Sequence, residues 1–149
     1  MRSEIEIPDT NLDGASTVYH ASTEGFRIAD VSGDHSAVQP GRIALVGDSF
    51  TFGVGVEYVR TFAGRLAASL PATEVDNYSM IGFGLDQMWM TLRSFALPRR
   101  SGLVIVAFID DDFDRSLTAY RNFEGMNKPK FILDADQLRR ATRDDRPGP

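Results

Sequence analysis

The sequence predicts an α/β domain in which helices cover both faces of a parallel sheet. Between residues 41 and 110, three short apolar runs alternate with two segments of helical periodicity, which is a β-α-β-α-β order. The third run, residues 103–109, is apolar throughout, as expected for a parallel strand that is covered on both faces. Because crossovers between parallel strands are right-handed, this order predicts a three-layer arrangement.

Composition narrows the class of protein. The chain has 149 residues, of which 42% are hydrophobic and 25% charged, and this suits a single domain with a substantial core. Its net charge of -5 argues against nucleic acid as a partner, because proteins that bind nucleic acid usually present a basic face. Without cysteine there is no disulfide framework and no thiolate metal site, and no cofactor is expected. The polar start predicts neither a signal peptide nor a membrane span, so the compartment is undetermined, with the cytoplasm as the default.

The chain divides into three parts by composition. Residues 1–40 are rich in Ser, Thr, Asp and Gly, and we expect an extended, partly ordered lead-in that packs on the domain. Residues 41–140 hold the apolar runs and form the predicted α/β domain. Residues 141–149 are charged and end in Arg-Pro-Gly-Pro, which predicts a flexible tail.

The first half of the predicted domain contains a strand and a helix. Ile43–Val46 is the first strand. Thr61 can cap a helix that Pro71 ends, because serine and threonine accept from the free N–H groups of a first helical turn. The helical spacing is carried by Phe62, Leu66 and Leu70.

The second half repeats this order and adds a hairpin. Glu74–Tyr78 is a weaker second strand, and a second helix follows it as far as Pro98. Its apolar stripe is formed by Leu85, Met88, Trp89, Leu92, Phe95 and Ala96. Two short runs, 131–133 and 137–138, flank Asp-Ala-Asp and predict a small hairpin outside the main sheet.

A short segment follows each predicted strand at the same edge of the sheet. Asp48 and Ser49 come after the first strand, residues 79–84 after the second, and Asp110–Asp112 after the third. In open parallel sheets, ligands bind beyond the carboxyl ends of the strands, so these three segments are the predicted functional edge. Ser49 has two interpretations there. It is either a turn or capping residue, or a hydroxyl exposed at a tight strand-to-helix turn where backbone N–H groups can stabilise an oxyanion.

The surrounding motifs favour the second interpretation. The segment GDSFTFGVGV, residues 47–56, followed by NYSMIGFG, residues 77–84, resembles the SGNH hydrolases, also called GDSL-type esterases and lipases. The stretches STEGFRIAD, GLDQ and NKPKFILDADQL are similar to one bacterial branch of that superfamily, so the resemblance covers about residues 24–138. It implies a three-layer flavodoxin-like fold and an esterase activity.

The resemblance also implies roles for individual residues. Ser49 matches the family's nucleophile, and its own N–H would supply one oxyanion donor. Gly82 matches the glycine whose N–H supplies a second donor. Asp48 would hold the turn that presents the serine. The implied substrate is an ester, such as a small acyl group on a carbohydrate or lipid.

The sequence departs from the family pattern in two places. Asp111 stands where the family usually has asparagine, and an ionised carboxylate would repel an oxyanion rather than donate to it. The family's Asp-x-x-His segment, which supplies the general base, has no counterpart, because the only histidines, His20 and His35, precede the first strand. We expect surface or loop roles for both. The predicted fold is therefore the amino-terminal part of the family's domain, truncated after the third strand and the hairpin.

Two alternatives to an ester hydrolase remain open. A catalytically inactive relative, or a non-functional fragment, is consistent with both departures and would at most bind a glycan or protein partner at the same edge. Alternatively, carboxylates at this edge could hold Mg²⁺ in a phospho-acceptor-like domain, although strand alternation opposes their convergence on one ion. The acidic residues concerned are Asp48, Asp110, Asp111, Asp112 and Asp114. A third strand without a neighbour further predicts self-association through an open sheet edge.

Overall fold

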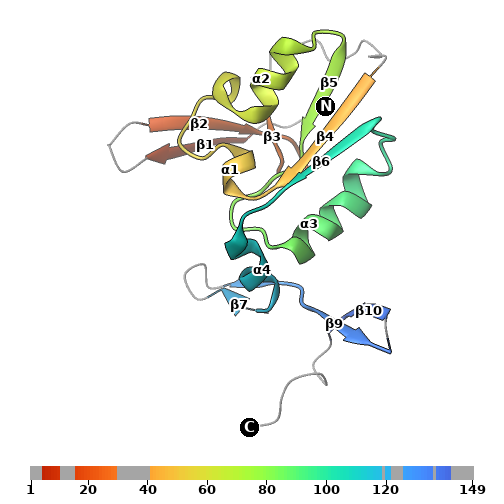
Figure 1. Ribbon diagram of the computed structural model, residues 1–149. Coiled ribbons are helices and arrows are strands. Elements are labelled where there is room, and N and C mark those ends of the chain that lie inside the picture. The colour runs from red at the N-terminus through yellow and green to blue at the C-terminus, as the bar shows by residue number, and fades with distance from the viewer. Residues whose placement is uncertain are drawn as a thin grey trace.

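The computed structural model describes residues 5–10, 16–29, 41–118, 120–121, 126–135 and 137–141, and these form a mixed α/β structure. Its centre is a three-stranded parallel sheet in the order β5-β4-β6, so the predicted parallel sheet is confirmed (Figure 1). The strands are β4 (Gly41–Gly47), β5 (Thr73–Asn77) and β6 (Leu103–Ala107). Four α-helices are described, namely α1 (Ser49–Phe52), α2 (Phe62–Ser69), α3 (Leu85–Thr91) and α4 (Asp110–Ser116).

The helices begin where the sequence allows their first N–H groups to be satisfied. The Thr61 side chain accepts the Gly64 N–H at 3.1 Å, which confirms the predicted cap of α2. A 3-10 turn (Tyr58–Arg60) precedes this cap. A π-helical turn (Leu92–Ala96) continues α3, so the second helical segment ends just before Pro98 as expected.

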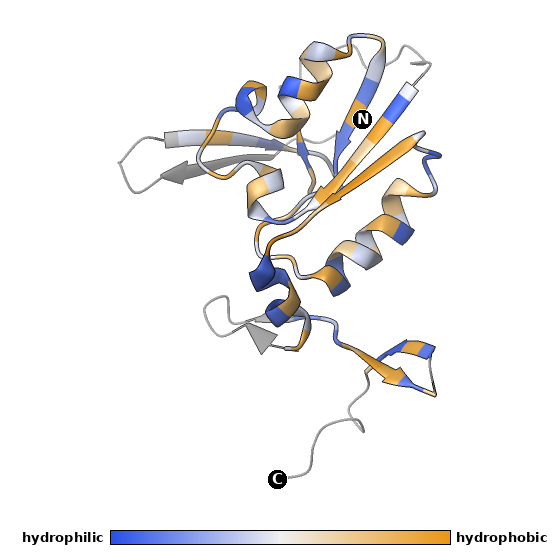
Figure 2. Cartoon of the chain, viewed as in Figure 1, coloured by the Kyte–Doolittle hydropathy of each residue, from blue (hydrophilic) through white to orange (hydrophobic). Residues whose placement is uncertain are grey.

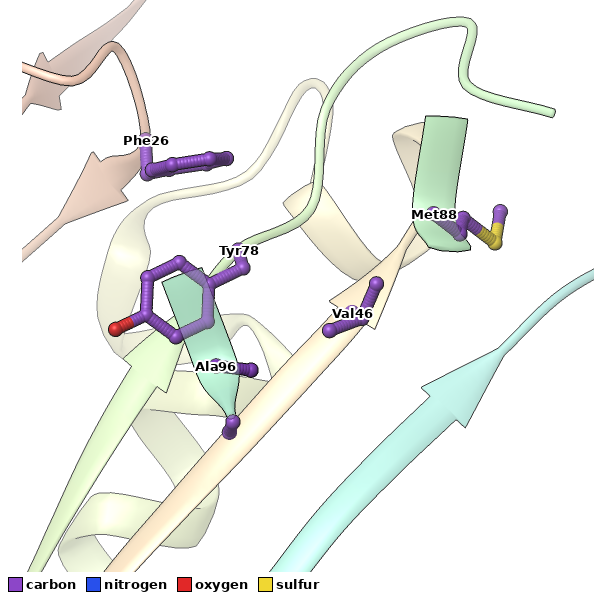
Figure 3. Close-up of a cluster of buried hydrophobic side chains, with 6 residues drawn as sticks. Phe26, Val46, Tyr78, Met88 and Ala96 are labelled. Carbon is purple, nitrogen blue, oxygen red and sulfur yellow. The ribbon is translucent and has the colours of Figure 1, made fainter. Parts of the chain in front are cut away.

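The core lies mainly on the α3 face of the sheet. Ala44 and Val46 are fully buried and face Met88 of α3 and Ala96 of the π-helical turn (Figure 3). Strand alternation sends Ile43 and Leu45 of β4 to the opposite face, where α1 and α2 lie. The predicted apolar stripe of α2 is only partly buried, because Phe62 at its start is 63% exposed.

The outer strand β6 is less covered than the sequence predicts. Its side chains were expected to be buried on both faces, but Leu103 and Val106 are 51% and 41% exposed. The reason is the strand order, because β6 lies at the end of the sheet and α3 packs on β4 and on one face of β6 only. The described residues therefore leave an apolar strand at the edge of the sheet (Figure 2).

The segment before β4 contains regular structure that the sequence reading did not anticipate. Three antiparallel strands pair in the order β1-β2-β3, with bounds β1 (Ile5–Thr10), β2 (Ser16–Ala21) and β3 (Arg27–Ile28). This small sheet is fixed to the domain by aromatic contacts. Tyr19 packs edge-to-face on Phe52 with ring centroids 5.1 Å apart, and Phe26 packs on Tyr78 at the same distance.

The remaining described strands form two short hairpins. Two-residue strands β7 (Tyr120–Arg121) and β8 (Met126–Asn127) pair with each other, and β9 (Phe131–Asp134) pairs with β10 (Gln137–Arg140). The second pair is the predicted hairpin, and it lies apart from the parallel sheet in Figure 1. The predicted tail, from residue 142 on, and His35 lie outside the described residues. Within the described ranges, no helix is both long and apolar enough to cross a membrane.

Candidate active site at the carboxyl edge of the sheet

Ser49 is the first residue of α1, directly after the buried strand β4. The Asp48 carboxylate caps this helix through Oδ1, which accepts the Phe50 N–H at 3.0 Å. The turn also ends tightly, because the Gly53 N–H donates to the Ser49 carbonyl oxygen at 3.0 Å and Gly53 has a left-handed φ of 84°. The Ser49 side chain is thus presented at a strand-to-helix turn, at an intermediate level of exposure.

A glycine before the turn is required by close packing. A Cβ added at Gly47 would lie 2.4 Å from Thr51 Oγ1 and 2.8 Å from the Ala107 carbonyl oxygen of β6. Neither approach is possible for a real carbon atom, and the second involves backbone that cannot move aside. The glycine of the GDSF segment therefore lets β6 and α1 approach the end of β4.

The loop after β5 is tied to this turn by backbone and amide groups. The Met80 N–H donates to the Gly47 carbonyl oxygen at 3.2 Å, and Asn77 Nδ2 donates to the Thr51 carbonyl oxygen at 3.3 Å. Asn77 Oδ1 also accepts the Ser79 N–H at 3.1 Å. Further along the same loop, Gly82 is buried with a φ of 78°, a conformation that favours glycine. The structure thus brings the Ser49 turn and the loop that contains Gly82 to the same sheet edge.

The aspartates that follow β6 differ in how far their side chains are buried. The Asp111 side chain is 75% exposed, whereas that of Asp112 is completely buried. Asp112 Oδ2 accepts the Ile109 N–H at 2.9 Å, and Oδ1 contacts Arg115 Nη1 at 2.5 Å. Burial raises the pKa of Asp112 and the charge of Asp48 raises it further, while the Ile109 N–H and Arg115 act in the opposite direction. The inward carboxylate is therefore Asp112 rather than Asp111.

Arg115 connects all three segments of the edge, and the sequence reading did not single it out. Its Nη1 lies 3.6 Å from Asp48 Oδ2 after β4, and it donates to the Phe83 carbonyl oxygen after β5 at 3.4 Å. The same nitrogen contacts Asp112, after β6. One signal in the sequence was its position three residues after Asp112, because side chains at that spacing lie on one face of a helix.

A second arginine, Arg27, holds the far end of the Ser49 turn. Its side chain is 1% exposed, and Nη1 donates to the carbonyl oxygens of Phe52 and Gly53 at 3.0 and 2.5 Å. The guanidinium also lies 4.5 Å from the centroid of the Tyr19 ring. Arg27 belongs to the STEGFRIAD stretch, so this part of the lead-in supports the turn after Ser49.

The one described histidine does not face this turn. Tyr19 of β2 points towards α1, since its hydroxyl oxygen accepts the Gly55 N–H at 2.7 Å. Alternation along the strand sends the neighbouring His20 to the opposite face of the small antiparallel sheet. His20 Nδ1 is buried there without a hydrogen-bond partner in the described residues. Within those residues, the chain brings no histidine to Ser49.

A buried ion pair joins two stretches that carry the family resemblance. Lys128 Nζ contacts Asp86 Oδ2, and the two side chains are only 4% and 5% exposed. Asp86 lies in the first turn of α3, in GLDQ, and Lys128 lies in NKPK. This contact fixes the segment after β8 on the start of α3, beside the candidate site. Apart from the presence of both charges, no pattern in the sequence predicts this pairing.

A cavity in the described part of the chain lies away from Ser49. It has a volume of about 220 Å³ and runs along the outer edge of β5, next to β3. Its lining includes the aromatic side chains of Phe26, Tyr78 and Phe95, which pack on one another. Glu24 and Arg99 also line it and form an ion pair of 3.8 Å. Burial raises the pKa of Tyr58, which also lines it, to about 12. Ser49 does not contribute to this cavity, so it is separate from the candidate site.

The described residues do not gather a metal site. They contain no group of three or more His, Cys, Asp or Glu side chains arranged to hold a metal ion. Of the acidic residues expected at the edge, Asp48 and Asp112 share Arg115 as their counter-charge, and Asp111 points to solvent.

Comparison with known proteins does not assign the chain to a family. No protein-family model matches the chain, and neither the curated proteins nor the solved structures include a match.

Proposed function

We propose that this chain carries the nucleophile half of an SGNH-type serine ester hydrolase site, with Ser49 as the nucleophile. The observation that carries the proposal is the placement of Ser49 at the start of a helix, next to a loop with a buried glycine, Gly82, at the carboxyl edge of a parallel sheet. The motifs GDSF and NYSMIGFG supply the same two segments in the same order.

The proposed chemistry follows from these positions. Ser49 Oγ would attack the carbonyl carbon of an ester, and the Oγ proton would pass to a general base. The carbonyl oxygen becomes an oxyanion, for which the backbone N–H groups of Ser49 and Gly82 are the proposed donors. The substrate class that fits the family resemblance is a small acyl ester on a carbohydrate or lipid.

The general base is the missing part of this proposal. A serine hydroxyl is a weak nucleophile without an adjacent base, and the described residues place no histidine at Ser49. Asp111, at the position expected for an oxyanion donor, is exposed and cannot donate when ionised. We therefore expect slow turnover or none from this chain alone.

A fluorophosphonate probe tests the proposal without knowledge of the substrate, because it reacts with activated serines. The chain is incubated with the probe, and its intact mass is compared with that of Ser49→Ala, while Ser69→Ala provides a control for an exposed serine in α2. A single adduct that maps to Ser49, and is absent only from Ser49→Ala, supports the hydrolase. Folded protein without an adduct contradicts an activated nucleophile.

A second candidate function is a non-catalytic domain that binds a glycan or a protein partner at this edge. Two observations about the site favour it. The lack of a histidine at Ser49 and the outward position of Asp111 both weaken catalysis but leave the edge intact. Binding of an acetylated oligosaccharide that is equally strong in wild type and in Ser49→Ala, without turnover, would support this candidate. Binding that is lost with the Ser49 hydroxyl would argue against it.

A further inference from the structure

Arg115 is the group through which the three loops at the site meet. Its side chain is 22% exposed, and one nitrogen, Nη1, lies against Asp48 Oδ2, Asp112 Oδ1 and the Phe83 carbonyl oxygen. These acceptors follow β4, β6 and β5 respectively. A single guanidinium therefore couples the position of the Ser49 turn to the other two segments.

Asp48 links Arg115 to the helical turn that begins with Ser49. Its side chain is buried, and its two oxygens have different surroundings. Oδ1 accepts the Phe50 N–H, whereas Oδ2 has no hydrogen-bond partner in the described residues and has Arg115 as its counter-charge. A buried carboxylate that loses its counter-charge must take up a proton or move, and either change disturbs the cap of α1.

The aliphatic part of the Arg115 side chain is also closely packed. A Cβ added at Gly84 would lie 3.0 Å from Arg115 Cβ, so the side chain leaves the helix against the backbone of the loop after β5. The second terminal nitrogen, Nη2, lies 4.0 Å from Asp111 Oδ2 on the solvent side. A lysine could keep the charge but not this planar arrangement of donors.

Among the described residues, three carboxylates pair with Arg115. Asp48 approaches from the turn after β4, and Asp111 and Asp112 approach from α4. On the far side of Gly84, Asp86 of α3 is paired with Lys128. Within the described part of the chain, Arg115 is thus the cation paired with the buried carboxylates Asp48 and Asp112.

We propose that Arg115 is the positioning residue of the Ser49 turn: its guanidinium orients the Asp48 carboxylate, and through it the first turn of α1. The inference rests on the proposed function, because it gives Arg115 a part in the chemistry of Ser49. Its geometric half, the link from Arg115 to the Phe50 N–H, can be measured whether or not Ser49 is reactive.

Amide hydrogen exchange at Phe50 tests that link directly. Arg115→Met keeps much of the aliphatic arm and removes the charge, and it should speed exchange of the Phe50 N–H by roughly tenfold, the effect of weakening a hydrogen bond to a charged acceptor. Arg115→Lys should give an intermediate rate. Arg65→Met, which removes an exposed arginine of α2, is the matched control and should leave the rate unchanged.

A double variant separates positioning from general loss of structure. In Arg115→Met/Asp48→Asn, the neutral amide oxygen still accepts the Phe50 N–H and no charge remains at the cap of α1, while Asp112 is the same as in Arg115→Met, so exchange should return towards the wild-type rate. Unchanged Phe50 exchange in folded Arg115→Met overturns the proposal, as does a failure of the double variant to slow it. If Arg115→Met does not fold, the same comparison is made between Arg115→Lys and Arg115→Lys/Asp48→Asn.

Probe labelling then connects the turn to Ser49. The rate of fluorophosphonate labelling at saturating probe should fall in Arg115→Met and recover in part in Arg115→Lys, while the probe concentration for half-maximal rate stays within about threefold. Equal labelling of Arg115→Met and wild type, at any pH between 6 and 9, contradicts a role in positioning Ser49. A wild type that is not labelled at all contradicts the proposed hydrolase, and the exchange rates alone then decide the part of Arg115 in the turn.

Discussion

Asp112 is the third residue of α4, and its side chain reaches back to the N–H of Ile109, the residue that precedes the helix. This reach is typical of an acidic residue at the third helical position. It turns Asp112 inward and leaves Asp111, one residue earlier, 75% exposed. The identity of the buried carboxylate thus depends on where the helix begins, which the run of three aspartates alone does not determine.

The raised pKa of Asp112 predicts a pH dependence of stability. A carboxyl whose pKa is higher in the folded chain binds its proton more tightly there, so it stabilises the fold at low pH. That contribution is lost as the pH rises from the ordinary value of 3.8 through the raised pKa. The difference in Tm between Asp112→Asn and wild type should therefore shift in favour of the variant between pH 4 and pH 7. Thermal unfolding across this range is the measurement, with Asp111→Asn, an exposed neighbour in the same run, as the matched control. A shift of equal size in both variants would contradict a special role for the buried carboxyl.

The close packing around Gly47 predicts that one added methyl group will lower the stability of the fold. Gly47→Ala places a carbon within 2.8 Å of the Ala107 carbonyl oxygen, and relieving this contact should lower the free energy of unfolding by about 1–3 kcal/mol. Gly102→Ala is the matched control, because its added carbon would meet the Arg42 carbonyl oxygen at an ordinary 3.7 Å. Urea titration of both variants measures the difference. Equal midpoints would show that the end of β4 can open to accept the methyl group.

At the scale of elements, the three strands of the parallel sheet and the helices α2 and α3 were predictable because their signals are local, whereas α4 was not predicted. β4 and β6 are runs of apolar residues, and α2 has a threonine cap and a proline after its end. The pairing of β1, β2 and β3 was not predicted, because these short segments mix polar and apolar residues and contain no continuous apolar run. The same holds for Arg115, whose contacts with Asp48 and Phe83 bridge 67 and 32 residues and leave no periodic pattern.

The cap of α2 gives a prediction at this scale. Thr61→Ala removes the oxygen that accepts the Gly64 N–H, and the hydroxyl that donates to the Tyr58 carbonyl oxygen. The expected loss in unfolding free energy is about 0.5–2 kcal/mol. Thr61→Ser keeps both hydrogen bonds and should recover most of that loss. Chemical denaturation of the three proteins is the measurement, and an equal loss in both variants would place the effect in the methyl group instead.

For the whole molecule, the distribution of apolar surface is uneven. The core cluster lies on the α3 face of the sheet, and it includes Phe26, with Val104 of β6 packed against it. In contrast, β6 and the segment after it also have large apolar side chains at the surface. Among these, Leu103, Phe108 and Phe113 are each about half exposed, at 51%, 53% and 50%. An apolar strand at the edge of a sheet has unpaired backbone groups as well as apolar side chains to offer another chain.

This edge predicts concentration-dependent self-association of the chain. Sedimentation velocity at increasing concentration should show a species larger than the 16.5 kDa monomer. Ile105→Lys places a charge at the centre of β6, where the side chain is already 37% exposed, so it should shift the distribution towards monomer without unfolding the domain. Val59→Lys, at a 73% exposed position in the 3-10 turn, is the matched control and should not. A wild type that sediments as a monomer at every concentration would contradict self-association through β6.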